Sequence, residues 1–321
     1  MKVNAELIIQ NKGKLYEPIT LEGITFQTER EKQPGKLTFS VLKDAGLSFG
    51  EGNPVRLKVN GQNVFYGFVF KKHRKNDKII DVTCYDQLRY LKAKDTYVYT
   101  NKSANEVIQM IAGDFRLKTG AMENTGYKIA TRVEENEELF QIIQNALDMT
   151  LQNTKKMFVL YDDFGKITLK NLANMKVNLL IDEETGQNFD YTSSIDNNTY
   201  NKVKLTYDNE ETGKREVFIA QDSNNMNKWG VLQYYDTIKK GENGKAKADA
   251  LLKLYNAKTR NLTIENAFGD VRIRAGSMVV VMLNLGDIKT KNWMVVEKCK
   301  HVFKQDEHFM TLNLRGGEFN A

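Results

Sequence analysis

The sequence predicts a mainly β protein of the α+β class, with β-rich regions at both ends and a smaller α+β region between them. Apolar residues alternate with polar ones over the first 95 residues, the spacing becomes helical after Thr100, and alternation returns from Tyr200. The chain has 321 residues, 41% of them hydrophobic and 27% charged, which is enough to bury two or three cores without disulfides or metals. We therefore expect three domains, at residues 1–95, 96–195 and 196–321.

The first region is predicted to be a small β-barrel or sandwich. Glycine and asparagine separate its apolar segments, and Asn60-Gly61 between two of them is a strong signal for a two-residue hairpin. The expected strands are Val3–Ile9, Ile19–Thr28, Lys36–Val41, Val55–Val59, Val64–His73 and Lys78–Tyr85.

The middle region is predicted to be a compact α+β unit. Ser103 and Glu106 form a capping-box pattern, and the helix that follows should end at Gly113. A second helix is expected to begin at Asn136-Glu137-Glu138, because two acids there favour the N-terminal end of the helix dipole. Its apolar face would contain Leu139, Phe140, Ile143, Ala146 and Leu147. A β-hairpin is expected next, from Phe158 to Leu169, with its turn at Asp162–Gly165.

The last region is predicted to be β structure with one inserted helix between Gly244 and Thr259. The expected strands are Lys202–Tyr207, Glu216–Ala220, Leu262–Glu265, Val279–Leu283, Trp293–Phe303 and Phe309–Leu314.

The two β-rich regions share an order of parts. Gly52 precedes an alternating strand, a turn, an apolar strand that ends at His73, and a final alternating strand. Gly276 precedes the same succession, with turns at Gly286-Asp287 and at Gln305–Glu307. Any two β-meanders can share such alternation, so coincidence is the alternative explanation. If the repeat is real, one chain carries two copies of one barrel, and three chains in a ring present six, which adapts threefold to sixfold symmetry.

Charge is distributed unevenly along the chain. The net charge is +6 for residues 1–100 (17 basic, 11 acidic), −5 for residues 101–200 (10 basic, 15 acidic) and +5 for residues 201–321 (20 basic, 15 acidic). The densest basic run is Lys71-Lys72-His73-Arg74-Lys75, at the end of an expected strand. A solvated hairpin end explains this run more simply than a phosphate-binding patch or a localisation signal.

No residues have the spacing of a catalytic or metal site. Cys299, His301 and His308 could meet across a hairpin turn, yet a Cys-x-His pair with one further histidine does not match a zinc-ligand spacing. A helix start and a turn explain the carboxylates that might form a glycosidase pair, namely Glu134, Glu135, Glu137, Glu138, Asp162 and Asp163. We therefore expect no catalytic residues, no cofactor, no bound metal and no enzymatic activity.

Other sequence features also indicate an ordinary globular protein. The glycine-bearing runs Gly46–Gly52 and Gly113–Gly120 lack the ending of a phosphate-binding loop. Cys84 and Cys299 lie far apart in apolar-alternating runs, which favours buried thiols in a reducing compartment. The longest apolar run, Met278–Leu283, is too short to span a membrane, and no targeting segment is visible, so we expect a soluble protein.

Several runs in the carboxyl-terminal third resemble a known family. They are Trp229–Gln233, Ala246–Ala257, Thr263–Asp270, Arg274–Ser277, Val295–His301 and His308–Leu312. In these runs the chain resembles the hub protein of PBSX-type phage elements, which is itself similar to the late control gene D class of contractile-tail baseplate hubs. The Gly52–His73 hairpin and the Asn136–Leu169 segment also fit, so the resemblance covers essentially the whole chain.

The resemblance implies a structural hub in the baseplate of a contractile phage tail or of a headless, tail-like bacteriocin particle. As in that family, two tube-like β-barrels per chain would build a homotrimeric, pseudo-sixfold ring that joins the hexameric tail tube to the trimeric spike. The implied partners are the tail tube protein, the spike protein, baseplate wedge proteins and a small LysM-bearing hub protein. The chain would be made in the bacterial cytoplasm, and no membrane is implied.

The end of the sequence departs from some relatives. Those relatives carry a fused spike or lysozyme domain, whereas this chain ends at Gly316–Ala321. A spike and a cell-wall hydrolase are therefore expected on other chains.

Two other classes of function stay open from the sequence. A nucleic-acid-binding protein would cluster basic residues with exposed aromatic side chains and would bind less tightly as salt rises. A peptidoglycan-active enzyme would need two carboxylates facing each other in a cleft.

Overall fold

The computed structural model describes residues 3–74, 76–182, 185, 188–196, 199–209, 212–238, 243–284 and 289–316. Contacts divide the chain into two compact units, one formed by residues up to Asp190 together with Leu262–Leu314 and the other essentially by Tyr191–Asn261. Among the described residues, none of the helices is both long and apolar enough to cross a bilayer.

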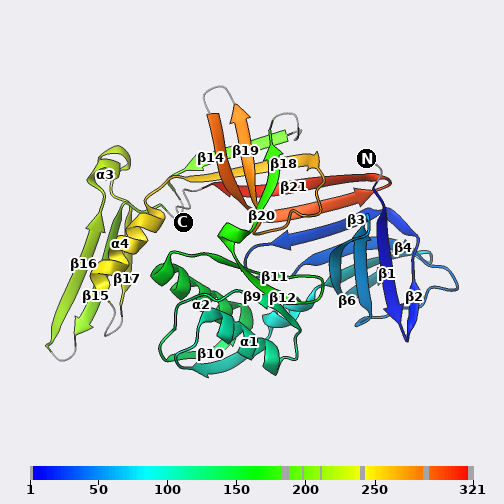
Figure 1. Ribbon diagram of the computed structural model, residues 1–321, viewed down its shortest axis with the longest axis horizontal. Helices are drawn as coiled ribbons and strands as arrows, with labels where there is room; N and C mark the ends of the chain where they lie inside the picture. The colour runs from blue at the N-terminus through cyan, green and yellow to red at the C-terminus, as the bar shows by residue number, and fades with distance from the viewer. Residues whose placement is uncertain are drawn as a thin grey trace. The chain divides into compact units, whose positions relative to one another are not determined.

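One large sheet of thirteen strands runs through the first unit (Figure 1). Its strands are β1 (Ala5–Asn11), β2 (Lys14–Tyr16), β3 (Thr20–Glu29), β4 (Lys36–Leu42), β5 (Pro54–Val59), β6 (Gln62–Arg74), β7 (Ile79–Tyr85), β13 (Lys176–Ile181), β14 (Asn188–Ser194), β18 (Thr259–Phe268), β19 (Met278–Asn284), β20 (Lys289–Lys304) and β21 (Glu307–Gly316). The expected strands of the first region and the last four expected strands are therefore confirmed, while the short strands β2, β13 and β14 were not expected.

Two sets of six strands in this sheet have the same order. The first set reads β3-β4-β7-β6-β5-β1, and the second reads β14-β18-β21-β20-β19-β13. Numbered from one to six along the chain, each set has the order 2-3-6-5-4-1. The pairing of the first strand of each set differs, because β1 is antiparallel to β5 whereas β13 is parallel to β19. The shared order of parts in the sequence thus extends to a shared strand order.

The mainly β class is confirmed, but closure into barrels is not. In the described part of the chain, β3 and β1 lie at opposite ends of the first hydrogen-bonded order, and β14 and β13 at opposite ends of the second. Each set is open by its backbone hydrogen bonds. The second set starts at Lys176, before the expected boundary at residues 195–196. Its strands β13 and β14 pair with strands about 65 to 100 residues later in the chain, and local sequence pattern does not reveal such pairing.

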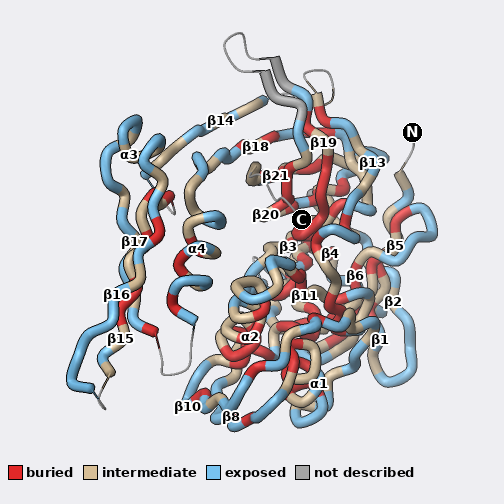
Figure 2. Tube along the Cα trace, turned by 60° about the vertical axis from the view of Figure 1, so that its left-hand side comes forward, coloured by how far each residue is buried: buried red, intermediate tan, exposed pale blue. Residues whose placement is uncertain are grey.

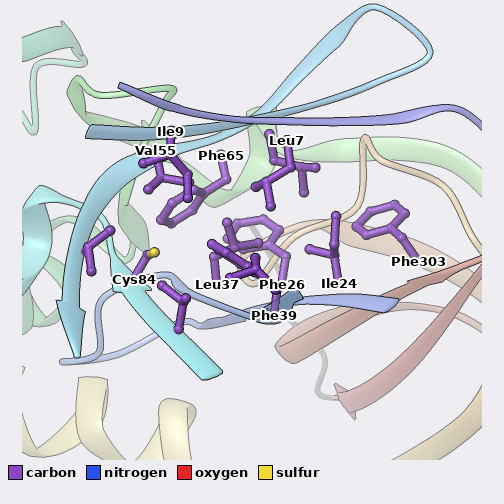
Figure 3. Packing of buried hydrophobic residues seen from close by; sticks show 14 of the residues in the cluster. Leu7, Ile9, Ile24, Phe26, Leu37, Phe39, Val55, Phe65, Cys84 and Phe303 are labelled. Carbon is purple, nitrogen blue, oxygen red and sulfur yellow. The ribbon is translucent and has the colours of Figure 1, made fainter. Parts of the chain in front are cut away.

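The core of the first set is aromatic and aliphatic (Figure 3). Phe26 and Phe65 meet edge to face with ring centroids 5.5 Å apart, and Phe39 and Cys84 are buried beside them. Phe303, which comes from β20 in the second set, is buried in the same cluster. Alternate residues of each strand enter this core, as the period-two pattern predicts.

The middle region forms a separate α+β core between the two sets. Its elements are η1 (Gln87–Lys92), β8 (Lys94–Tyr99), α1 (Ala104–Asp114), β9 (Thr119–Met122), β10 (Arg132–Glu138), α2 (Leu139–Thr154), β11 (Phe158–Asp162), β12 (Ile167–Asn171) and η2 (Leu172–Asn174). The first helix and its capping box are confirmed, since the Ser103 N–H donates to Glu106 at 2.6 Å. The hairpin β11–β12 is confirmed too. The second helix begins at Leu139 and not at Asn136, because the preceding residues pair with β8 as strand β10.

The second unit has its own three-stranded sheet. It contains β15 (Lys202–Asn209), β16 (Lys214–Gln221), α3 (Ser223–Trp229), β17 (Gln233–Thr237) and α4 (Gly244–Tyr255), with the strand order β16-β15-β17. Figure 2 shows buried positions on α4 and on the strands of this unit, where Leu205 and Leu251 belong to one core. The expected strands and helix between residues 202 and 259 are confirmed, but they form a sheet apart from that of β18–β21.

Candidate assembly interface

Two turns with the same backbone hydrogen bonds lie at equivalent places in the two six-stranded sets. The Gly52 N–H donates to the Val69 carbonyl at 2.8 Å, and the Gly276 N–H donates to the Val296 carbonyl at 2.8 Å. Both glycines have positive φ, +82° and +90°, a conformation that costs little only for glycine. Gly52 therefore corresponds to Gly276, and Val69 corresponds to Val296.

Side chains close the two turns in the same way. Asn53 accepts a hydrogen bond from the Gly50 N–H through Oδ1 at 2.9 Å, and Ser277 accepts one from the Arg274 N–H through Oγ at 3.1 Å. Each is a short polar side chain bonding to the backbone three residues before it. The two turns thus match residue by residue, and the run Gly46–Gly52 leads into such a turn.

Beyond the second turn, β20 joins the two sets. Its residues from Lys298 to Phe303 pair antiparallel with β3, from Glu29 back to Ile24. The Lys298 ammonium lies 3.0 Å from the Glu29 carboxylate at the end of this ladder. Strand β20 therefore continues beyond the last residue that pairs with β19, Val295. This continued part of β20 pairs with β3, the edge strand of the first set.

A second ion pair closes the same junction. The Arg30 guanidinium donates through Nε to Glu297 at 2.7 Å, and the Arg30 backbone N–H donates to the Glu297 carbonyl at 2.9 Å. The Arg30 side chain is only 7% exposed, so this pair is screened less than a surface pair.

Each set also has a strand edge equivalent to one side of the β20–β3 junction. In the described residues these two edges, on the last residues of β6 and on β14, have no strand partner. Strand β6 pairs with β5 only up to Phe68, and from Lys71 to Arg74 it pairs with β7 alone. Strand β14 is the last strand of the large sheet and neighbours only β18. The basic run singled out in the sequence therefore lies along an open strand edge, apart from Lys75, which is outside the described residues.

A buried ionic cluster ties the middle region to both sets. Asp86 accepts from the Gly35 N–H at 2.8 Å, and Arg274 donates through Nη2 to the Asp162 carbonyl at 2.8 Å while its guanidinium lies 4.0 Å from the Tyr161 ring centroid. Burial, together with the nearby Asp162 charge, raises the pKa of Asp86 well above its usual value, and burial lowers the pKa of Arg274. The sequence did not reveal this cluster, because its members are far apart along the chain.

Three residues considered as metal ligands form a hydrogen-bonded chain. Cys299 and His301 face the same side of β20, with Sγ and Nε2 3.1 Å apart, and His301 Nδ1 lies 2.9 Å from His308 Nε2. His301 Nε2 also lies 2.9 Å from the Ile273 carbonyl, so both ring nitrogens of His301 have partners. Burial lowers the pKa of His301 to about 3 and that of His308 to about 4, and it raises the pKa of Cys299. Both Cys299 and Cys84 are buried free thiols, as expected.

The carboxylates considered for a glycosidase pair have structural partners. Glu134 is buried and accepts from Arg132 at 2.8 Å and from Asn145 at 3.0 Å. Glu135 and Glu137 lie in β10, so the explanation that they cap a helix is wrong for these residues, and only Glu138 directly precedes α2. Asp162 ends β11 and accepts from the Gly165 N–H at 2.6 Å, and Asp163 follows in the turn.

The other glycine run is local structure. Gly113 lies in the last turn of α1, and Gly120 lies in β9. No group of three histidine, cysteine or acidic side chains is arranged to hold a metal within the ranges that the structure describes.

Comparison with known proteins identifies the family. The family model described as YQBQ-like matches residues 24–315. The chain is 30% identical over 322 residues to the uncharacterized protein YqbQ of Bacillus subtilis strain 168, covering 96% of both chains. It is also 30% identical over 308 residues to the phage-like element PBSX protein XkdQ of the same organism, covering 92% of both.

Solved structures share the fold at low identity. One is the 43 kDa tail protein of prophage MuSo2 from Shewanella oneidensis, with a TM-score of 0.70, 13% identity and coverage of 96% of this chain and 98% of the other. Another is the E. coli c3393 protein, described as a type VI secretion component similar in structure to the T4 phage tail proteins gp27 and gp5, with a TM-score of 0.60, 8% identity and coverage of 98% and 78%. The match over nearly the whole length, together with the two relatives in Bacillus subtilis, shows that the chain belongs to the YQBQ-like family, which includes PBSX-type phage-element proteins.

Proposed function

We propose that this protein is a structural hub of a contractile phage tail or tail-like particle, in which three chains form a ring between the hexameric tail tube and the trimeric spike. The observation that carries the proposal is the identical strand order of the two six-stranded sets, together with the matched turns at Gly52 and Gly276. One chain thus presents the same structural pattern twice.

Duplication within a chain is a way to join parts of different symmetry. A ring of three chains that each carry two similar sets offers six similar surfaces on one side, while the rest of each chain keeps threefold symmetry. In this proposal the two sets serve as the tube-like domains, and the α+β region and the β15–β17 unit lie outside the six repeated surfaces.

The relatives support a place in a phage tail. XkdQ belongs to a phage-like element, and the solved structures of similar fold include prophage tail proteins and a secretion component compared with gp27 and gp5. On this basis we assign the chain to the baseplate of the particle. Its partners would be the tube protein, the spike protein, wedge proteins and a small LysM-bearing hub protein.

The role is mechanical, because a hub holds tube and spike in line. No catalytic step is assigned to it. The polar clusters of the described residues instead join elements of the fold: Glu134 binds α2 to β10, and Arg274 binds the second set to β11.

The proposal can be tested in the bacterium that produces the particle. A strain that lacks this gene should release tubes and sheaths without assembled baseplates, and the intact chain supplied from a plasmid should restore complete particles. Labelling of the chain with antibody-coated gold should mark the spike end of the tail. Complete, functional particles from the deletion strain would refute the proposal.

A further inference from the structure

We propose that the open edge of β14 in one chain pairs with the open edge of β6, residues Lys71–Arg74, in a neighbouring copy of the same chain. The pairing would continue the large sheet from one subunit to the next. The inference rests on the proposed ring of three chains and names the strands that close it.

The junction inside the chain supplies the pattern. There, the second strand of the first set, β3, pairs with the fifth strand of the second set, β20. In the repeated order, β14 is the second strand of the second set and β6 is the fifth strand of the first set. Applying the same junction again therefore brings β14 to β6. The two strands do not pair with each other within one chain in the described residues, so the β6 edge that meets β14 belongs to another chain.

The matched turns fix which part of β6 takes part. Val69 corresponds to Val296, and the ladder between β20 and β3 begins at Lys298, two residues after Val296. The corresponding residue in β6 is Lys71. From Lys71 onward β6 has β7 on one side only, so its outward N–H and C=O groups can accept another strand.

Both edges are accessible, and their charges are complementary. Lys71, His73 and Arg74 are exposed. The neighbouring Lys72 is partly buried, and its ammonium donates a hydrogen bond to the Phe49 carbonyl at 2.6 Å. Strand β14 contains the exposed Asp190 and no basic residue. The junction inside the chain uses the same chemistry, since Lys298 there pairs with Glu29. An acidic strand edge would thus meet a basic one.

The partner of each open edge is a copy of this chain. A contact between two different surfaces of identical chains can repeat from chain to chain. It gives a closed ring when the rotation between neighbouring chains adds up to a full turn, and an open filament when it does not. Two open edges on one chain that fit each other are what a closed ring of identical chains needs.

Disulfide cross-linking tests the pairing directly. Cys84 and Cys299 are buried, so introduced cysteines report without background. His73→Cys is combined in turn with Asn188→Cys, Asp190→Cys and Thr192→Cys, three exposed positions on one face of β14. The control combines His73→Cys with Leu15→Cys, which is 56% exposed on β2 at the other end of the large sheet. Each variant is oxidised as the pure chain and in tail particles from the producing bacterium.

The expected result is a disulfide between chains for one or two of the β14 positions and none for the control, with covalent products that stop at three chains. A charge reversal, Asp190→Lys, should lower the cross-linking yield roughly two- to fivefold at the other positions, and Lys71→Glu with Arg74→Glu in the same chain should restore it.

The outcomes separate the two proposals. Particles that contain the variants but show no β14 cross-link, or show the control cross-link equally, overturn the edge pairing even if three copies are present. Cross-linked products that continue beyond three chains support the edge pairing but contradict the ring of three.

Discussion

Gly52 and Gly276 occupy the same backbone position in two copies of one structural pattern. Each has positive φ, and each donates its N–H at 2.8 Å to the carbonyl of a valine on the second strand that follows it, Val69 on β6 and Val296 on β20. The two glycines differ in their surroundings. A Cβ atom at Gly276 would lie 2.5 Å from Val159 Cγ1, whereas a Cβ atom at Gly52 would have no atom within 4 Å.

This difference predicts unequal effects for one substitution made twice. Gly52→Ala should cost about 1 kcal/mol of stability, from backbone strain alone. Gly276→Ala should cost about 1 to 3 kcal/mol more, because the new methyl group must displace Val159 in a packed region. Chemical unfolding of the two variants measures both losses of stability. Equal losses would contradict the conclusion that Val159 crowds a side chain at Gly276 but nothing crowds one at Gly52.

The buried cluster predicts a large effect at Arg274 and a small one at its neighbour. Arg274→Met should cost about 3 kcal/mol or more, since it leaves the buried Asp86 and Asp162 without their cation. Arg272 pairs with Asp270 at 2.6 Å on the surface, so Arg272→Met should cost less than about 1 kcal/mol. Urea unfolding compares the two, and similar losses would show that the cluster does not stabilise the fold.

The histidine pair predicts loss of stability in mild acid. His301 and His308 are held neutral in the folded chain, with pKa values of about 3 and about 4, while both titrate near 6.5 when unfolded. Below pH 6.5 the unfolded chain therefore binds more protons, so stability falls as pH falls toward 4. At pH above 6.5 this contribution is constant.

Substitution of one histidine isolates this effect. His308→Gln should make the dependence of stability on pH between 6.5 and 4 shallower, by up to about 1.4 kcal/mol per pH unit. Unfolding midpoints measured across this pH range test the prediction. If stability depends on pH as steeply in His308→Gln as in the unmodified chain, the two buried histidines do not cause the loss of stability in acid.

The same hydrogen-bonded chain predicts that the protein binds no zinc. Both ring nitrogens of His301 are already within 2.9 Å of partners, and a metal would have to displace the Ile273 carbonyl or His308. Elemental analysis of the purified chain should find far less than one zinc per chain. One equivalent that disappears in Cys299→Ala would overturn this expectation.

Local patterns in the sequence were enough to find most elements. Asn60-Gly61 predicted the β5–β6 turn, and Ser103 with Glu106 predicted the start of α1, because the residues that decide these structures are neighbours in the chain. The positions of Gly52 and Gly276 even indicated the repeat. Each of these signals depends on backbone conformation within a few residues.

Long-range pairing could not be predicted in the same way. Strands β13 and β14 are short, and their partners come about 65 to 100 residues later. The ladder between β3 and β20 joins residues about 270 to 280 positions apart. The salt bridge between Glu29 and Lys298 on this ladder forms only once the two strands meet. Likewise, Arg274 and Asp86 look like surface residues in the sequence but are buried together in the fold.

Salt should affect the assembly of subunits. The open β6 edge carries Lys71 and Arg74, and the open β14 edge carries Asp190, so raising the ionic strength from about 0.05 to 0.5 M should weaken association between chains. Mass measurement of the chain mixed with its tube and spike partners at several salt concentrations tests this. Association that strengthens with salt would indicate an apolar contact in place of the charged edges.

The copy number of this chain at the junction of tube and spike tests the central proposal most directly. Cryo-electron microscopy of the complete particle should show three copies in a ring, with the two six-stranded sets of each chain at six similar positions facing the tube. One copy or six copies at that junction, or three copies whose two sets do not alternate around the ring, would contradict the proposal.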